Sequence, residues 1–190
     1  MEWIEANALK RKMLITVEGQ PFSIVDVMYA SPSARGASTM ARVKLRNLLN
    51  GAVLEKNFKT SERFTVPDVE ETPASFLYSE DTTYHFMDDT SYEQFSLSFE
   101  KLGDLKGYIK EGVEIKAVKY NGAYISLSLP VYVELQVITT EPVIKGATAS
   151  GNVTKVAELE TGISVRVPMY IEQGDKVKVN TQTGEVAGRA

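Results

Sequence analysis

Glycine-containing dipeptides divide this 190-residue chain into short segments that leave little room for long helices. Glu18-Gly19, Asn50-Gly51 and Asn121-Gly122 each stand between two apolar runs. Dipeptides of this kind favour tight hairpin turns, because glycine and asparagine tolerate the positive φ angles that such turns require. The sequence therefore predicts an all-β fold built from antiparallel hairpins.

The segment 40–49 has the clearest strand pattern, because basic and apolar residues alternate along it. The basic residues are Arg42, Lys44 and Arg46, and the apolar ones are Ala41, Val43 and Leu45. Successive side chains of a strand point to opposite faces, so the three basic residues share one face. We expect this face to contact the RNA backbone; the alternative is a strand face that is merely solvated.

Proline-containing stretches predict the boundaries between three consecutive small β-barrels. Residues 65–73 are acidic and contain Pro67 and Pro73, and Pro130 follows another predicted strand. The predicted domains are an SH3- or KOW-like barrel (1–64) and two OB-fold barrels (65–129 and 130–190). Strands are expected at 13–17, 22–29, 40–49, 53–59, 75–78, 83–87, 94–98, 114–120, 124–129, 131–139, 153–159, 164–167, 176–180 and 185–187, with one short helix at 99–109.

A run of small residues between two predicted strands marks the tip of a long hairpin. This run, 31–39, reads Ser-Pro-Ser-Ala-Arg-Gly-Ala-Ser-Thr, and Arg35 is its only large charged side chain. So thin a loop can enter a narrow site, and a planar guanidinium suits phosphates, base edges and 2′-hydroxyls. The alternative is an ordinary hairpin loop that Arg35 keeps soluble.

Charge is distributed unevenly along the chain, although the net charge is only −4. Residues 1–64 carry ten Lys/Arg against six Asp/Glu, and residues 65–129 carry five against twelve. Within the first part, 27–54 contains no acidic residue. A basic face beside an acidic middle favours a polyanionic partner that is bound at one end only.

Rare residue types exclude several kinds of site. The chain has no cysteine and one histidine, His85, so thiolate or histidine metal sites and Ser-His-Asp catalysis are hard to build. His85 lies in an alternating run and is expected to be a strand residue. No metal, cofactor or enzymatic activity is expected. The sequence lacks a signal-peptide pattern and an apolar run of membrane-spanning length, so we expect a soluble cytosolic protein with no membrane partner.

Widely spaced residues in the third predicted domain form a recognisable signature. They are Lys155, Ala157, Gly162, Val165, Val167, Pro168, Ile171 and Gly174. This spacing resembles the signature of bacterial elongation factor P. Further similarity at 41–46, 76–78, 85–87 and 183–185 extends the resemblance over essentially the whole chain.

Two segments depart from the usual pattern of that family. The family tip is typically Pro-Gly-Lys-Gly, whereas 31–37 is longer, has arginine in place of lysine, and resembles the elongation factor P-like paralogue branch. The third-domain loop has Gly146-Ala147-Thr148 where the family usually has Gly-Asp-Thr. The resemblance implies that this loop meets the E-site codon, a contact for which backbone donors and Thr148 remain.

The resemblance also implies a function in translation. It implies an L-shaped, tRNA-like monomer that binds the 70S ribosome between the P and E sites and rescues ribosomes stalled at consecutive prolines. The residues implied to lie beside P-site peptidyl-tRNA and rRNA are Ser31, Pro32, Ser33, Ala34, Arg35, Gly36 and Ala37. A rigid probe there can restrict peptidyl-tRNA to a reactive arrangement, with no residue acting as an acid or base.

Two other function classes compete with this interpretation. A general single-stranded RNA- or DNA-binding protein with OB folds would expose aromatic residues in a basic groove, yet the aromatic residues concentrate in the acidic middle domain. A hydrolase could use paired carboxylates such as Asp88 and Asp89. Adjacent strand residues point to opposite faces, so that pair is better explained by turn chemistry.

Overall fold

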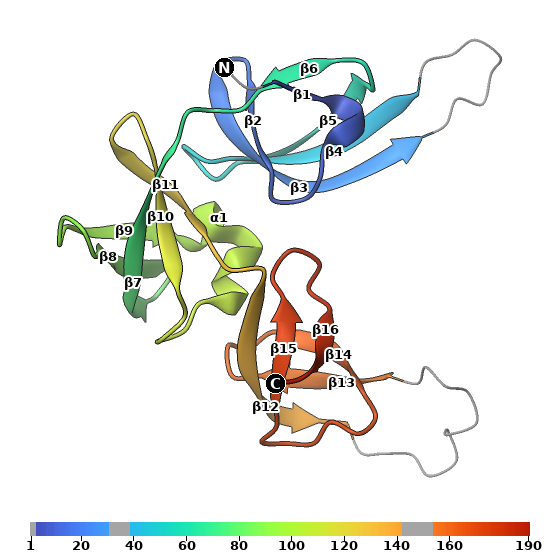
Figure 1. The fold of residues 1–190 in the computed structure, drawn as a ribbon, viewed down its shortest axis with the longest axis vertical. Helices are drawn as coiled ribbons and strands as arrows, with labels where there is room; N and C mark the ends of the chain where they lie inside the picture. The colour runs from blue at the N-terminus through green and yellow to red at the C-terminus, as the bar shows by residue number, and fades with distance from the viewer. Residues whose placement is uncertain (1–2, 31–38, 142–153) are drawn as a thin grey trace. The chain divides into compact units, whose positions relative to one another are not determined.

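The computed structural model describes residues 3–30, 39–141 and 154–190 (Figure 1). Strands form 59% of the described residues and helices 8%, which confirms the predicted all-β class. Within these residues, no helix is both long and apolar enough to cross a membrane. The chain divides into two compact units, Met1–Gly103 with Lys116–Ser128, and Asp104–Ile115 with Leu129–Ala190.

The first unit contains a four-stranded antiparallel sheet whose strands follow chain order. They are β2 (Leu14–Val17), β3 (Gln20–Ala30), β4 (Met40–Asn47) and β5 (Val53–Lys59). The predicted hairpin turn between β2 and β3 is confirmed, because Glu18 and Gly19 have φ angles of 52° and 77°. A short 3-10 turn, η1 (Ala6–Ala8), precedes the sheet.

A separate two-stranded sheet was not predicted from the sequence. It pairs β1 (Trp3–Glu5) antiparallel with β6 (Arg63–Thr65). Each strand has only three residues, which is too short to display an alternating pattern. This pair joins the two ends of the first 65 residues, so these residues close on themselves without help from the rest of the chain.

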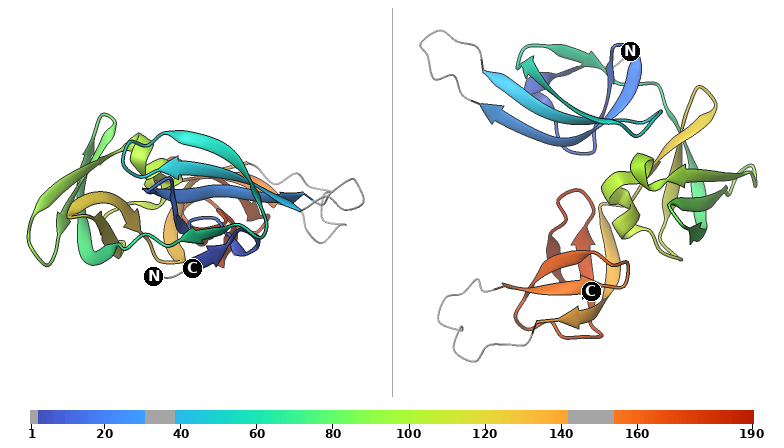
Figure 2. Two further views of the ribbon diagram at one scale, coloured as in Figure 1. Left: turned by 90° about the horizontal axis from the view of Figure 1, so that it is seen from above. Right: turned by 180° about the vertical axis from the view of Figure 1, so that it is seen from behind.

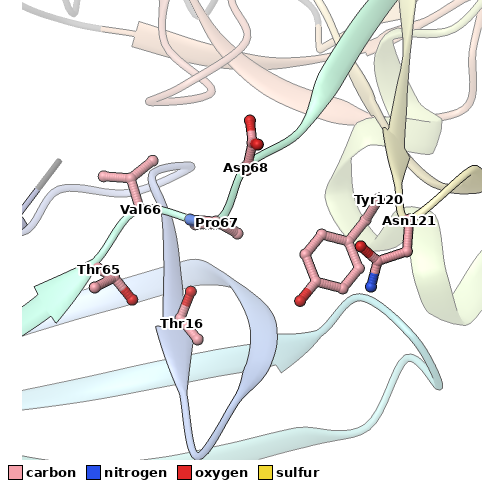
Figure 3. A pocket seen from close by; sticks show the side chains of 7 residues that line it. All are labelled: Thr16, Thr65, Val66, Pro67, Asp68, Tyr120 and Asn121. Atoms are coloured by element: carbon pink, nitrogen blue, oxygen red, sulfur yellow. The ribbon is translucent and has the colours of Figure 1, made fainter. Parts of the chain in front are cut away.

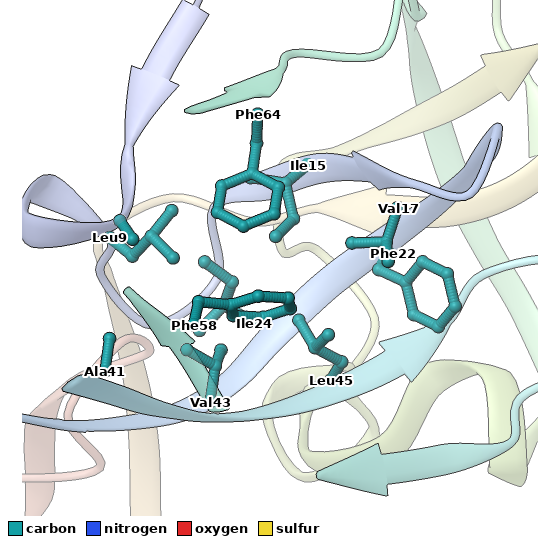
Figure 4. Packing of buried hydrophobic residues seen from close by; sticks show 11 residues of the cluster. Leu9, Ile15, Val17, Phe22, Ile24, Ala41, Val43, Leu45, Phe58 and Phe64 are labelled. Carbon is teal, nitrogen blue, oxygen red and sulfur yellow. The ribbon is translucent and has the colours of Figure 1, made fainter. Parts of the chain in front are cut away.

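Alternation along the longer strands fills an apolar core on one face of the four-stranded sheet (Figure 4). Ile24, Val43 and Leu45 are fully buried, and Leu45 is paired in register with Ile24. Phe58 packs edge-on against Phe64, with 4.7 Å between their ring centroids. Because this face is apolar, the intervening residues of β4 are directed to the opposite face of the sheet.

A five-stranded sheet with the order β11-β10-β7-β8-β9 completes the first unit. Its strands are β7 (Glu70–Glu80), β8 (Thr83–Asp88), β9 (Gln94–Ser98), β10 (Ile115–Tyr120) and β11 (Ala123–Ser128). The predicted tight turn between β10 and β11 is confirmed by positive φ angles at Asn121 and Gly122 (50° and 79°). A single α-helical turn, α1 (Phe99–Leu102), follows β9.

The second unit contains another five-stranded sheet, with the order β14-β13-β12-β15-β16. Its strands are β12 (Tyr132–Thr140), β13 (Thr154–Leu159), β14 (Ser164–Pro168), β15 (Lys176–Asn180) and β16 (Val186–Arg189). Counted along the chain, both five-stranded sheets have the order third-second-first-fourth-fifth, which is that of an OB barrel. Both sheets curl as half-barrels, as the two further views show (Figure 2). The predicted OB class is confirmed.

Two predicted elements differ from the structure by more than two residues at one end. Strand β7 begins at Glu70 rather than at Ser75, so Pro73 lies within a strand and not in the predicted boundary 65–73. The first residues of β7 are mostly exposed and polar, so the sequence shows no apolar alternation there and the strand was not predicted. The predicted helix 99–109 is one α-turn followed by the 3-10 helix η2 (Gly103–Tyr108), because Gly103 has a positive φ of 54° that ends the α-turn.

The buried aromatic cluster of the first OB sheet provides a test of its core. Phe86 is fully buried, and its ring centroid lies 5.4 Å from that of Phe95 and 5.8 Å from that of Phe76. We expect Phe86→Ala to lower the free energy of unfolding by about 3–5 kcal/mol, because it leaves a cavity. Urea denaturation measures this. Tyr92→Ala, at a residue that is 75% exposed, is the control and should change stability by about 0.5 kcal/mol or less; equal effects would contradict the core assignment.

Candidate nucleic-acid interface

The predicted tip segment follows a strand stem that is paired up to its last described residues, with one register shift between Ile24 and Asp26. Strands β3 and β4 pair from Phe22 and Asn47 up to Ala30 and Met40, and β5 pairs with the other edge of β4. Of the predicted tip 31–39, only Thr39 is described, and its carbonyl accepts from Thr60 N at 3.1 Å. The other predicted tip residues lie outside the described residues: Ser31, Pro32, Ser33, Ala34, Arg35, Gly36 and Ala37.

Tyr29 anchors the β3–β4 stem next to its last described pair, Ala30 with Met40. Its hydroxyl lies 2.8 Å from the carbonyl oxygen of Leu9 and 3.1 Å from that of Ala6. Burial raises the pKa of the Tyr29 hydroxyl, and the hydrogen bond to Leu9 opposes that shift only in part. The hydroxyl is therefore protonated at neutral pH and donates to these carbonyls, which ties the end of β3 to the η1 turn.

The basic residues of β4 share one face of the sheet, as the sequence predicted. Arg42 and Lys44 are exposed, Arg46 is half-buried, and the apolar residues between them are buried. Sequence reasoning missed the acidic neighbours on this face. Asp26 of β3 and Glu55 of β5 are both in register with Lys44, and Arg42 forms an ion pair with Glu55.

Arg46 differs from its two basic neighbours, because its guanidinium is used within the protein. Its Nη1 atom donates a hydrogen bond of 2.5 Å to the backbone carbonyl of Glu100 in α1. The sequence carried no signal for this contact, which joins residues 54 positions apart. The exposed cations of this face are therefore Arg42 and Lys44, with Lys59 beside the tip end of β4.

Several aromatic residues of the acidic middle region form core, although Tyr78 and Tyr92 are exposed. Phe86 and Phe95 are buried, and the ring of Tyr124 stacks on Phe95 at 3.9 Å. His85 is a strand residue, as predicted, and its ring stacks on Tyr78 at 4.4 Å while Nδ1 lies 2.8 Å from Ser96 Oγ. This arrangement lacks the basic groove with aromatic platforms that a general single-strand binder requires.

Asp88 is a fully buried carboxylate that is held by several donors. Its Oδ2 atom lies 2.9 Å from Lys119 Nζ and accepts hydrogen bonds from Thr72 Oγ1 at 2.7 Å and Tyr124 OH at 3.1 Å. The hydrogen bond from Lys119, and then that from Thr72, hold the pKa of Asp88 well below its usual range. A carboxylate that stays ionised and enclosed is structural, which argues against a paired-carboxylate hydrolase.

Asp89 does not join Asp88 in a shared site. Its carboxylate accepts from Ser75 Oγ at 2.8 Å, whereas the backbone N–H groups of Thr90 and Ser91 donate to Asp88 Oδ1 at 2.9 and 3.1 Å. The Asp88 carboxylate therefore stabilises the turn after β8, as the turn interpretation predicted, whereas the Asp89 carboxylate bonds to β7 instead. Within 3–30, 39–141 and 154–190, no group of three or more potential metal ligands comes together.

A polar cleft of about 640 Å³ lies beside the segment that follows β6 (Figure 3). It is lined by Thr16, Thr65, Val66, Pro67, Asp68, Tyr120 and Asn121. Asp68 supplies the one charged side chain of this lining. An anionic lining of this kind repels phosphate, so the cleft does not extend the basic face of β4.

The predicted codon loop of the second unit lies outside the described residues, together with Gly146, Ala147 and Thr148. The chain is paired on either side of it, since Glu141 N donates to Val156 O and Val156 N donates to the Glu141 carboxylate, each at 3.2 Å. The signature residues Lys155 and Ala157 occupy buried positions of β13. Their spacing therefore reflects the packing of this sheet.

An all-β protein with two OB-type sheets, a paired hairpin stem and a basic strand face belongs structurally with the RNA-binding factors of translation. Sequence models of elongation factor P match three successive parts of the chain: the KOW-like domain (5–64), the OB domain (69–127) and the C-terminal domain (133–189). The chain belongs to the elongation factor P family.

Curated relatives match over nearly their whole length. The elongation factor P of Oleidesulfovibrio alaskensis is 44% identical over 95% of this chain and 96% of the relative. That of Thermodesulfovibrio yellowstonii is 41% identical over 96% of each chain, and that of Caldanaerobacter subterraneus is 39% identical over 98% of this chain and 99% of the relative.

The Asp88 network predicts a specific dependence of stability on acid. Because the folded pKa of Asp88 is depressed, its stabilising contribution is complete above the unfolded pKa of about 3.9 and is lost as the pH falls below it. We expect Asp88→Asn to be destabilised at neutral pH and to lose less further stability between about pH 4 and pH 2 than the parent. Urea unfolding across this range measures it.

Asp89→Asn is the matched control, since this carboxylate is exposed and bonded to Ser75. We expect its stability to fall with acid as steeply as that of the parent. An acid limb of Asp88→Asn as steep as that of the control would show that Asp88 is not the titrating group.

Proposed function

We propose that this chain binds the ribosome between the P and E sites and promotes peptide-bond formation when translation stalls at proline-rich motifs. One observation carries this proposal: β3 and β4 stay paired up to Ala30 and Met40, so the segment with Arg35 follows directly from the end of a braced stem. Family membership supports ribosome interaction. The partners of the tip are then P-site peptidyl-tRNA and nearby rRNA.

The mechanism that we propose is positional. Peptidyl-prolyl-tRNA reacts slowly because its geometry is poor, and a rigid probe at its CCA end reduces the arrangements that it samples. The described side chains support a role without acid or base chemistry. Asp88 is locked in an ion pair with Lys119, and His85 is stacked on Tyr78 and bonded to Ser96.

We further propose that this chain belongs to the paralogue branch with an arginine tip. The support is the sequence Ser-Pro-Ser-Ala-Arg-Gly-Ala at 31–37, which lacks the lysine of the usual family tip. An arginine offers a planar fork of donors where lysine offers a compact point charge. Recognition of the CCA end then depends on the geometry of donors as well as on charge.

The remaining parts of the proposal concern organisation. We propose domains at 1–64, 65–129 and 130–190, a division that the family matches at 5–64, 69–127 and 133–189 support. We also propose a monomer that acts in the cytoplasm, since the ribosome is the partner. The loop with Gly146, Ala147 and Thr148 is proposed to meet the E-site codon.

Arg35 provides the direct test of the tip. We expect Arg35→Ala to abolish stall rescue while ribosome binding and stability stay near those of the parent, because a single side chain in this segment of small residues contributes little to either. Arg35→Lys is expected to rescue only in part, since it keeps the charge and loses the planar fork. The measurement is peptide-bond formation on a polyproline message in a purified translation system at saturating factor.

A message without proline runs is the control, and all variants should translate it equally. Stall rescue by Arg35→Ala at the parental rate would contradict the proposed role of the tip. Other parts of the protein would then have to position peptidyl-tRNA.

The basic face of β4 provides a second, independent test. We expect Arg42→Met and Lys44→Met each to weaken ribosome binding and to reduce the slope of log affinity against log salt by roughly one unit, because one phosphate contact is lost. Equilibrium binding at several salt concentrations measures the slope. Lys116→Met is the control, because Lys116 is an ion-paired surface cation like Arg42 but lies on β10, outside the four-stranded sheet that carries the basic face. Parental slopes in both β4 variants would reduce this face to a solvated surface.

A further inference from the structure

The end of β4 farthest from the tip segment, at the base of the hairpin stem, packs against the OB sheet and α1. The basic-face interpretation does not explain these contacts. Leu48, which follows β4, is 1% exposed and packs with Val118 of β10 and Ile125 of β11. Asn47 is also buried, and its Oδ1 atom accepts from Leu49 N at 2.8 Å, which shapes the turn after β4. The turn between β4 and β5 therefore packs against the five-stranded OB sheet of the same unit.

Arg46 supplies the polar contact of this joint. Its guanidinium donates to the carbonyl of Glu100 at 2.5 Å. The last carbonyls of a helix lack partners within the helix, and α1 is only one turn long, so an external donor is required. Arg46 thus satisfies a group that α1 itself leaves open.

Two glycines make room for this contact. A Cβ atom on Gly103 would lie 2.7 Å from the Cζ, Nε and Nη2 atoms of Arg46, so the guanidinium lies directly against the backbone. A Cβ atom on Gly51 would lie 3.1 Å from the carbonyl carbon of Glu100. Gly51 and Gly103 therefore allow the end of the stem and α1 to approach closely, because neither carries a Cβ atom.

We propose that Arg46 is a positioning residue that fixes the β3–β4 stem, and with it the segment carrying Arg35, to the OB sheet of the first unit. It does not contact RNA, although it shares a strand face with Arg42 and Lys44. This assignment rests on the proposed function of the tip. A stem that pivots at its base spreads the tip over many positions, which removes the entropic advantage of a rigid probe.

Pulsed electron–electron double resonance on the free protein tests the contact between the stem and the OB sheet without the ribosome. The chain has no cysteine, so Asn57→Cys on β5 and Gln94→Cys on β9 give a unique spin-label pair. We expect Arg46→Met to broaden the distance distribution between these labels, while Lys44→Met leaves it as narrow as in the parent. A narrow distribution in Arg46→Met overturns the proposal.

Salt dependence separates a positioning role from an RNA contact. We expect Arg46→Met to retain the parental slope of ribosome affinity against salt, whereas Lys44→Met loses roughly one unit. Stall rescue by Arg46→Met at saturating factor should nevertheless fall below that of Lys44→Met. A slope reduced in Arg46→Met as much as in Lys44→Met overturns the proposal and makes Arg46 a phosphate contact.

The distance measurements do not depend on the proposed role of the tip. Stall rescue by Arg35→Ala at the parental rate would refute the proposed function, but it would not contradict the positioning role of Arg46.

Discussion

Backbone pairing on both edges of β4 is the constraint on which the candidate interface depends. A strand with β3 on one side and β5 on the other has no free edge, so its register is fixed and its side-chain alternation becomes permanent. Val43 and Leu45 are committed to the core, and Arg42 and Lys44 are committed to the opposite face. The basic face is therefore a consequence of the two hydrogen-bonded ladders that hold β4.

Most of the fold could be predicted because its determinants are local. Period-two alternation located the long strands, and the turn dipeptides Glu18-Gly19 and Asn121-Gly122 adopt the positive φ angles that their residue types allow. The failures have local causes as well. Strands β1 and β6 are too short to alternate, and the exposed polar residues at the start of β7 hid the strand that contains Pro73.

The candidate site was less predictable, because its electrostatics depend on register and on distant contacts. The stretch 27–54 contains no acidic residue, yet Asp26 and Glu55 flank Lys44 across the strands. The contact from Arg46 to Glu100 joins residues 54 positions apart. Predicting either contact requires knowing which strands and turns lie side by side, and the local residue pattern does not reveal this. The three basic residues therefore looked equivalent until the backbone of α1 was placed.

The ladder around β4 has a mechanical consequence. A pull at Ala30 and Met40 along the strand axis loads the β2–β3 and β4–β5 ladders in shear, so their hydrogen bonds resist together and do not open one by one. Tyr29 adds a lateral tether to the carbonyls of Leu9 and Ala6 at the same end. Force applied at this end of the hairpin is therefore resisted by both ladders and by the Tyr29 tether together.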